Sequence, residues 1–102
     1  MKFQQPHSLA KDEARRRVER LTRHWQQKHG VNVTWDGDAA RLVGAVNGIT
    51  FDARVVVSDR QVDAEGTDPG ILVRAMATAY FKRKLAAYLD PKKTLEELDR
   101  QV

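Results

Sequence analysis

The stretch LVGAVNGITFDARVVV, residues 42–57, places an Asn-Gly pair between two runs of residues that favour β-strands. Asn and Gly tolerate the positive φ angles of a two-residue type I′ turn, so the stretch predicts a β-hairpin that turns at Asn47-Gly48. The register pairs six residues that share one face: Val46 with Ile49, Gly44 with Phe51, and Leu42 with Ala53. Because a one-residue slip would turn this set outward, the turn and the core face are specified together.

The sequence on both sides of the hairpin continues the same alternation. Residues 31–36 alternate apolar and polar side chains, and a turn centred on Gly37-Asp38 pairs Val33 with Leu42. A tight turn at Ser58-Asp59 predicts three further pairs: Val57 with Arg60, Val55 with Val62, and Ala53 with Ala64. We therefore predict a four-stranded antiparallel meander with strands at about 31–36, 40–46, 49–57 and 61–65.

One face of this meander is predicted to be apolar and the other polar, as in a sheet that packs on one side only. The inward set is Val31, Val33, Trp35, Leu42, Val46, Ile49, Phe51, Val55 and Val62. The outward set is Thr34, Asp36, Arg41, Asp52, Arg54, Asp63 and Glu65. The inward face needs a cover, which the two ends of the chain can supply.

A long helix is predicted at about residues 9–29. Ser8 is placed to cap its first turn, and Gly30 suits a left-handed residue at its end. Its apolar stripe is Ala10, Ala14, Val18, Leu21 and Trp25. The opposite side carries Arg16, Arg20 and Arg23. Three pairs at i,i+4 spacing neutralise part of this charge: Asp12 with Arg16, Glu13 with Arg17, and Glu19 with Arg23.

The last third of the chain predicts a second long helix at about residues 69–89 and a short one at about 94–101. Asp68-Pro69 suits a helix start, and Thr94 with Glu97 has the spacing of a capping box. The long helix carries two apolar stripes: Leu72, Ala75, Met76, Ala79 and Ala86, and Ile71, Phe81, Leu85, Tyr88 and Leu89. One sheet face cannot cover both stripes, so the helix is expected to contact the first helix or a second subunit as well.

The predicted fold class is α+β, with both long helices packed on one sheet face. A length of 102 residues with 41% apolar residues matches one small globular domain, residues 1–102. The absence of cysteine excludes disulfides, thiolate metal sites and cysteine nucleophiles. No apolar run has the length of a signal-peptide core or a membrane span, so we expect a cytoplasmic protein.

Charge is distributed unevenly along the chain. Residues 8–29 and 69–89 each carry a net charge of +4, whereas residues 31–68 carry −4. Basic helices beside an acidic sheet can steer an anionic partner, although the same charges can also meet within the fold or across an oligomer contact. The candidate anion-facing residues are Arg16, Arg20, Arg23, Lys82, Arg83 and Lys84.

The sequence contains no recognisable catalytic or metal-binding constellation. The histidines are His7, His24 and His29, and no carboxylate pattern completes a zinc motif with them. Ser8 and Ser58 lie in a predicted cap and a predicted turn, without the Gly-rich elbow of a serine nucleophile. We therefore predict a protein that is not an enzyme and that binds no metal and no cofactor.

The order of these features resembles a small bacterial family, the polyhydroxyalkanoic acid system proteins. The matching stretches are residues 6–9 (PHSL), 13–19 (EARRRVE), 35–38 (WDGD), 46–57 (VNGI onward) and 70–89. The resemblance implies an association with polyhydroxyalkanoate storage granules or with the genes for their synthesis. It implies no activity and supplies no active-site residues.

We therefore expect a non-enzymatic accessory protein in the cytoplasm or on granules, whose second long helix contacts a partner. The candidate interaction surface is Ile71, Phe81, Leu85, Tyr88 and Leu89, and the candidate partners are a second copy of the chain or a granule-coating protein. A nucleic-acid-binding regulator that uses the basic helix faces is the alternative, and its affinity would fall steeply with salt. A small enzyme of unknown type is the third hypothesis.

Overall fold

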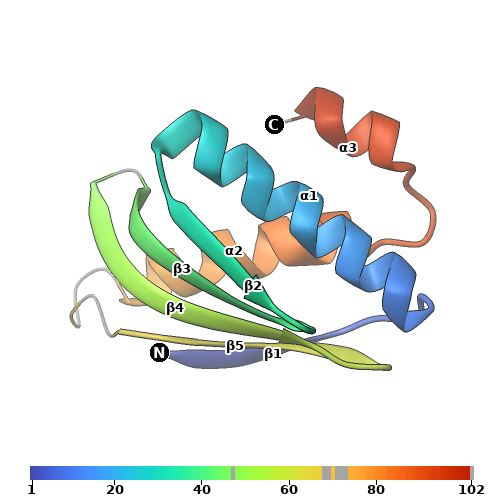
Figure 1. The fold of residues 1–102 in the computed structure, drawn as a ribbon, viewed down its shortest axis with the longest axis horizontal. Coiled ribbons are helices and arrows are strands. Elements are labelled where there is room, and N and C mark those ends of the chain that lie inside the picture. Colours follow the sequence, from blue (N-terminus) through green and yellow to red (C-terminus); the bar gives the residue numbers. More distant parts are fainter. Residues whose placement is uncertain (47, 68–69, 71–73, 102) are drawn as a thin grey trace.

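The structure, a computed structural model, describes residues 1–46, 48–67, 70 and 74–101. Within these residues the chain forms one five-stranded antiparallel sheet with helices on one face (Figure 1). The elements are β1 (Lys2–Pro6), α1 (Lys11–His29), β2 (Asn32–Asp36), β3 (Ala39–Val46), β4 (Ile49–Val57), β5 (Gln61–Gly66), α2 (Arg74–Tyr88) and α3 (Leu95–Gln101). The strand order is β1-β5-β4-β3-β2, so both ends of the sheet are formed by strands next to α1 in sequence.

The hairpin of β3 and β4 has the predicted register. Val46 pairs with Ile49, Gly44 with Phe51, and Leu42 with Ala53. Asn47 lies outside the described residues, and Gly48 has the positive φ (79°) that the predicted turn requires. The predicted pair of Val33 with Leu42 is also present, so β2 joins the hairpin as expected.

The prediction of four strands is wrong, because residues 2–6 form a fifth strand, β1, antiparallel to β5. Its sequence signal is weak: Phe3 alone is a large apolar residue, and Pro6 cannot donate a backbone hydrogen bond. The polar side chains and the missing backbone donor of Pro6 are tolerated because β1 is an edge strand. The ladder continues beyond it, with His7 N donating to Arg60 O over 2.8 Å.

The start of α1 also differs from the prediction. The helix begins at Lys11 with Ala10 as its N-cap, and no side chain caps it, so Ser8 does not have the predicted role. The reason is β1: the chain is bonded in the sheet as far as His7 and needs the next residues to turn into the helix. Ala10 is therefore exposed, whereas the rest of the predicted stripe, Ala14, Val18, Leu21 and Trp25, is buried. Gly30 ends the helix in the predicted left-handed conformation, with φ of 69°.

The turn between β4 and β5 is shifted by one residue from the prediction. Ser58 N donates to Gln61 O over 2.9 Å, so Asp59 and Arg60 are the central residues. Val57 therefore pairs with Val62, not with Arg60, and the other two predicted pairs are displaced in the same way. The displacement along β5 is two residues, which keeps every side chain on its predicted face.

The core lies between the inner sheet face and the helices. Its largest fully buried side chains include Leu21, Leu42, Val62, Tyr88 and Leu98, so all three helices contribute to it or to its cover. α3 begins after Thr94 as predicted, because Thr94 Oγ1 accepts a hydrogen bond from Glu97 N over 3.2 Å. The predicted helix start at Asp68-Pro69 lies outside the described residues.

Candidate functional site

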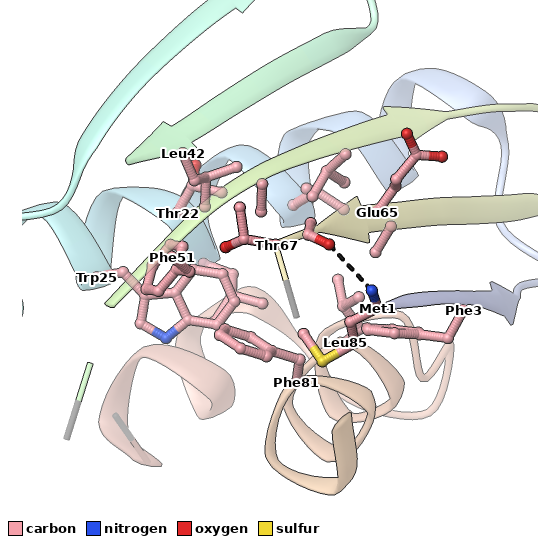
Figure 2. Close-up of a pocket in the computed structure, with 16 residues that line it drawn as sticks. Met1, Phe3, Thr22, Trp25, Leu42, Phe51, Glu65, Thr67, Phe81 and Leu85 are labelled. Carbon is pink, nitrogen blue, oxygen red and sulfur yellow. Dashed lines mark hydrogen bonds between the residues drawn. The ribbon is translucent and has the colours of Figure 1, made fainter. Parts of the chain in front are cut away.

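An apolar cavity lies between the inner face of the sheet and the helices α1 and α2 (Figure 2). Its volume is about 40 Å³, and its walls come from β1, α1, β3, β4, β5 and α2. Three aromatic side chains gather on one side of it: the Phe81 ring meets Trp25 and Phe51 edge-on, with centroid distances of 5.4 and 5.7 Å. The cavity is therefore bounded by a fixed aromatic wall.

Small residues in the sheet create this space. Ala53 pairs with Gly66 across β4 and β5, and Ala64 lies two residues before Gly66 on the same inward face. A Cβ at Gly66 would come within 3.1 Å of Ala53 Cβ, so the floor is already closely packed there. At about 24 cal/mol per Å³, an empty cavity of about 40 Å³ costs roughly 1 kcal/mol of stability.

The hydroxyls of the two threonines at the cavity wall and the nitrogen of Met1 already have partners. Thr22 Oγ1 donates to Glu19 O over 2.9 Å, and Thr67 Oγ1 accepts from Asp52 N over 3.2 Å. The backbone nitrogen of Met1 donates to Gly66 O over 3.0 Å, a bond drawn in Figure 2. The cavity thus offers mainly apolar contact, and the hydroxyls of Thr22 and Thr67 are already engaged within the protein.

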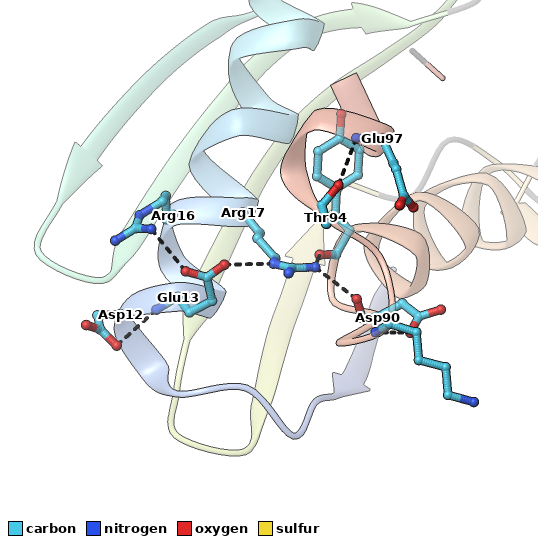
Figure 3. A network of polar contacts seen from close by, with 9 residues as sticks. Asp12, Glu13, Arg16, Arg17, Asp90, Thr94 and Glu97 are labelled. Carbon is cyan, nitrogen blue, oxygen red and sulfur yellow. Dashed lines mark hydrogen bonds and ion pairs between the residues drawn. The ribbon is translucent and has the colours of Figure 1, made fainter. Parts of the chain in front are cut away.

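A second cluster, of polar groups around Arg17, accounts for the burial of this arginine of α1. Arg17 is 7% exposed and lies between Glu13 and the end of α2 (Figure 3). Its Nε donates to Glu13 Oε1 over 3.1 Å, and one terminal nitrogen donates to Tyr88 O and Asp90 O over 3.1 and 2.9 Å. Arg17 therefore supplies a donor to Tyr88 O at the end of α2 and a second donor to Asp90 O, which also accepts from Lys93 N over 3.1 Å.

The predicted anion-facing arginines of α1 are all engaged in ion pairs. Arg16 pairs with Glu13 over 3.1 Å, Arg20 with Asp99 over 2.8 Å, and Arg23 with Glu19 over 3.4 Å. Arg16 thus pairs with Glu13 and not with Asp12, which was its predicted i,i+4 partner. Asp99 Oδ1 also lies 2.9 Å from His24 Nε2, and this second contact links α3 to α1.

The predicted anion-facing cations of α2 differ from those of α1. Among the described residues, Lys82, Arg83 and Lys84 have no ion pair, and each has a cationic group 5.8 Å from an aromatic ring. Lys82 lies near Phe3, and the other two lie near Tyr80. The structure therefore leaves the α2 cations available while it uses the α1 arginines internally.

The predicted interaction surface lies mostly inside the protein. Leu85, Tyr88 and Leu89 are 3%, 1% and 2% exposed, and Phe81 is half-buried. Ile71 is outside the described residues. The larger side chains of this stripe bury more apolar area than the alanines of the other stripe, so they face the sheet.

The exposed stripe of α2 is the one that contains Met76. Ala75, Ala79 and Ala86 are exposed with it, and Met76 itself is 61% exposed. Leu72, the first residue of that predicted stripe, lies outside the described residues. Among the described residues, Val43 on the outer sheet face is the other exposed large apolar side chain, at 38%.

The described residues contain neither a candidate metal-ion site nor a helix that could span a membrane. They contain no cluster of three or more His, Cys, Asp or Glu side chains that could hold a metal ion. In the same part of the chain, no helix combines the length and the apolar character needed to cross a bilayer.

Comparison with known proteins identifies the family. A family model described as "Putative polyhydroxyalkanoic acid system protein" matches residues 1–92. The chain belongs to this family. No curated protein and no solved structure gives a significant match. The family match contains the whole sheet, α1 and α2 and ends before α3, so the cavity and the exposed stripe of α2 both lie within it.

The sequence features missed two parts of this site. The cavity depends on β1, which was not predicted, and on Ala53, Ala64 and Gly66 facing one space. Three small residues at inward positions of neighbouring strands were the available signal. The arginine network was predicted only as the pair of Glu13 with Arg17, because the carbonyls that Arg17 also binds lie some 70 residues away.

Proposed function

We propose that this member of the polyhydroxyalkanoic acid system family is a non-enzymatic accessory protein that binds the surface of storage granules through the exposed stripe of α2. The family description supports the link to the polymer system. The observation that carries the proposal is the exposure of Met76, at 61%, in the middle of a stripe of alanines. A solvent-facing helix side is normally polar, so an apolar one suggests a surface that is covered in use.

The charges beside this stripe fit an interfacial helix. Lys82 and Arg83 are exposed next to the alanines and have no ion pair within the described residues. Amphipathic helices that lie on apolar surfaces commonly carry Lys and Arg at the edges of their apolar face. The cations would therefore strengthen docking on a granule coat that carries negative charge, while Met76 and the alanines make the apolar contact.

The opposite side of α2 makes this docking compatible with the folded protein. Leu85 and Tyr88 are buried against the core, and Arg17 holds the end of the helix. The helix can therefore present its outer stripe without leaving the sheet. This corrects the predicted interaction surface: we expect contact through the stripe of Met76 and not through the stripe of Leu85.

The test is the distribution of the tagged protein between the soluble and granule fractions of a polymer-accumulating host. Burial of a methionine side chain contributes about 1.5–3 kcal/mol, so Met76→Gln should lower granule binding about tenfold or more. Val43→Gln is the matched control, because it removes an exposed apolar side chain from the outer sheet face, where we expect no docking. Equal binding of both variants and the parent protein would contradict the proposal.

Salt washes separate the alternatives. Retention on granules through high salt is expected for apolar docking. Lys82→Gln is expected to weaken binding at low salt and to have less effect at high salt, because salt screens the exposed cationic edge. Complete release by modest salt, with steep salt dependence of binding to DNA or RNA, would favour the nucleic-acid alternative. The ion pairs of Arg16, Arg20 and Arg23 weaken that alternative, because these side chains would have to leave their acidic partners to contact phosphates.

A further inference from the structure

We propose that the cavity between the sheet and the helices α1 and α2 binds a short alkyl chain of a small aliphatic molecule. The inference does not depend on the proposed docking of α2, because it concerns the inner side of that helix. It starts from the cavity itself: about 40 Å³ remain open among buried core side chains, whereas protein interiors are normally packed with few voids.

The cavity reaches the surface at one edge of the sheet. Met1 contributes to its wall and is half-buried, at the point where β5 ends and β1 begins. In Figure 2 Met1 lies on the side away from Trp25. A ligand can therefore enter where β5 ends and β1 begins, with its chain pointing toward the aromatic wall and its polar end at the solvent.

The chemistry of the wall selects the class of ligand. The side chains that face the space are almost all apolar, and the hydroxyls of Thr22 and Thr67 are already hydrogen-bonded. A charged or strongly polar group inside would lose its hydration without gaining partners. The small volume excludes a rigid polycyclic ligand, whereas an unbranched chain can follow the space between Phe81 and the small residues of the sheet.

The wall also contains a side chain that can adapt. Met1 is flexible and unbranched, and it lies at the surface end of the cavity. It can move to accept a chain longer than the empty volume alone would hold. The aromatic wall, fixed by the contacts of Phe81 with Trp25 and Phe51, gives the other end a defined limit.

The test is a titration of the full chain with 1-butanol, 1-pentanol and 1-hexanol, followed by methyl NMR. Methyl signals of Val55 and Leu85, which line the cavity, should shift and saturate, while those of Val43 on the outer sheet face should not. Each methylene that enters the cavity should raise the affinity about fourfold. Shifts that increase linearly to the solubility limit of each alcohol, or equal shifts at Val43, would overturn the proposal.

Two cavity-filling variants test the location. Ala53→Leu extends a half-buried side chain over Gly66, and Ala64→Met fills the floor from the neighbouring strand. Each should lower the affinity for 1-hexanol tenfold or more, and Ala45→Leu on the outer side of β3 is the matched control that should not. Unchanged affinity in either variant that remains folded would refute the site, and Ala53→Leu keeps the test valid if Ala64→Met fails to fold.

Two further tests change the head group of the ligand and the exposed stripe of α2. Hexanoate and hexylamine share the chain of 1-hexanol, so binding of all three with similar affinity is expected if the chain alone is recognised. Binding of only one charged form would show that the head group, and not the chain, decides, and would overturn the assignment. Met76→Gln should leave the affinity for 1-hexanol unchanged, so failure of granule docking and failure of chain binding are distinguishable.

Discussion

The buried arginine of α1 gives the sharpest stability prediction. Arg17→Met keeps much of the side-chain volume but removes the charge and every donor. Tyr88 O and Asp90 O, which Arg17 binds over 3.1 and 2.9 Å, would then have no donor from α1. The substitution should therefore weaken the attachment of the end of α2 to α1.

The magnitude follows from the bonds that are lost. Hydrogen bonds to a charged donor contribute about 1.5–3 kcal/mol each, but the methionine recovers part of the packing. Glu13 loses a partner as well, and its carboxylate is near enough to solvent to be rehydrated. We expect Arg17→Met to lower the free energy of unfolding by about 3 kcal/mol, a large share of the roughly 5–15 kcal/mol of a domain of this size. Arg17→Lys retains the charge but cannot reproduce the fork, and should lose about 1–2 kcal/mol.

The assay is urea unfolding followed by far-UV circular dichroism, with the midpoint and slope fitted separately. Arg16→Met is the matched control, because Arg16 is an exposed neighbour that, within the described part of the chain, pairs with Glu13 alone. It should change the free energy of unfolding by less than about 0.5 kcal/mol. If Arg17→Met destabilises no more than Arg16→Met, the carbonyl contacts do not carry the stability that we assign to them.

Three further predictions concern pH and capping. Burial raises the pKa of Tyr88 to about 12 from its usual 10.0. Between these two values unfolding releases a proton, so the free energy of unfolding should fall as the pH rises through this range. Tyr88→Phe should remove most of this fall, whereas the control Tyr80→Phe should not. Thr94→Ala should lower the free energy of unfolding by about 1 kcal/mol in urea, unless α3 contributes nothing to the cooperative unit. The hydrogen bond from Arg41 holds the pKa of Asp52 below its usual value. The pair therefore stabilises the fold at pH above the usual pKa of Asp52, and this stabilisation is lost as the pH falls through the lowered pKa. NMR titration should show a higher pKa of Asp52 in Arg41→Gln, and an unchanged pKa would refute the pairing.

The parts of the fold that local sequence predicted are those whose determinants lie close together in the chain. The hairpin of β3 and β4 needs only the turn residues and the alternation beside them, and its register was correct. The stripe from Ala14 to Trp25 needs only helical periodicity, and it is buried. In both cases the signal spans fewer residues than the element that it specifies.

The errors come from pairings between distant segments. β1 pairs with β5, about 60 residues later, and its own sequence contains Gln and Pro where a strand usually has apolar or β-branched residues. The start of α1 moved because β1 extends as far as Pro6 and His7. In the turn before β5, Ser58-Asp59 and Asp59-Arg60 are nearly equivalent by composition, and the hydrogen bond from Ser58 N to Gln61 O decides between them.

The two stripes of α2 show why the candidate site could be found only in part. Periodicity predicted two apolar stripes, and in the described part of α2 one is buried or half-buried and the other is exposed, but periodicity could not say which one faces the sheet. Leu85 and Tyr88 reach the core because they fill the space beside α1, and Met76 is left outside as a consequence. The exposed surface of a doubly apolar helix is thus a result of tertiary packing, although its composition is visible in the sequence.

The basic segments make the same point for charge. Residues 8–29 and 69–89 have equal net charge, yet they differ in what they can bind. In α1 the arginines form ion pairs with Glu13, Glu19 and Asp99. Asp99 lies in α3, so its contact with α1 could not be predicted from the sequence of α1. In α2 no acidic residue lies within the described helix, so Lys82 and its neighbours have no partner at i,i+4 spacing. An anionic or granule-coating partner should therefore be sensitive to Lys82→Gln and Arg83→Gln and much less so to Arg23→Gln, although net charge alone would treat the three substitutions as equal.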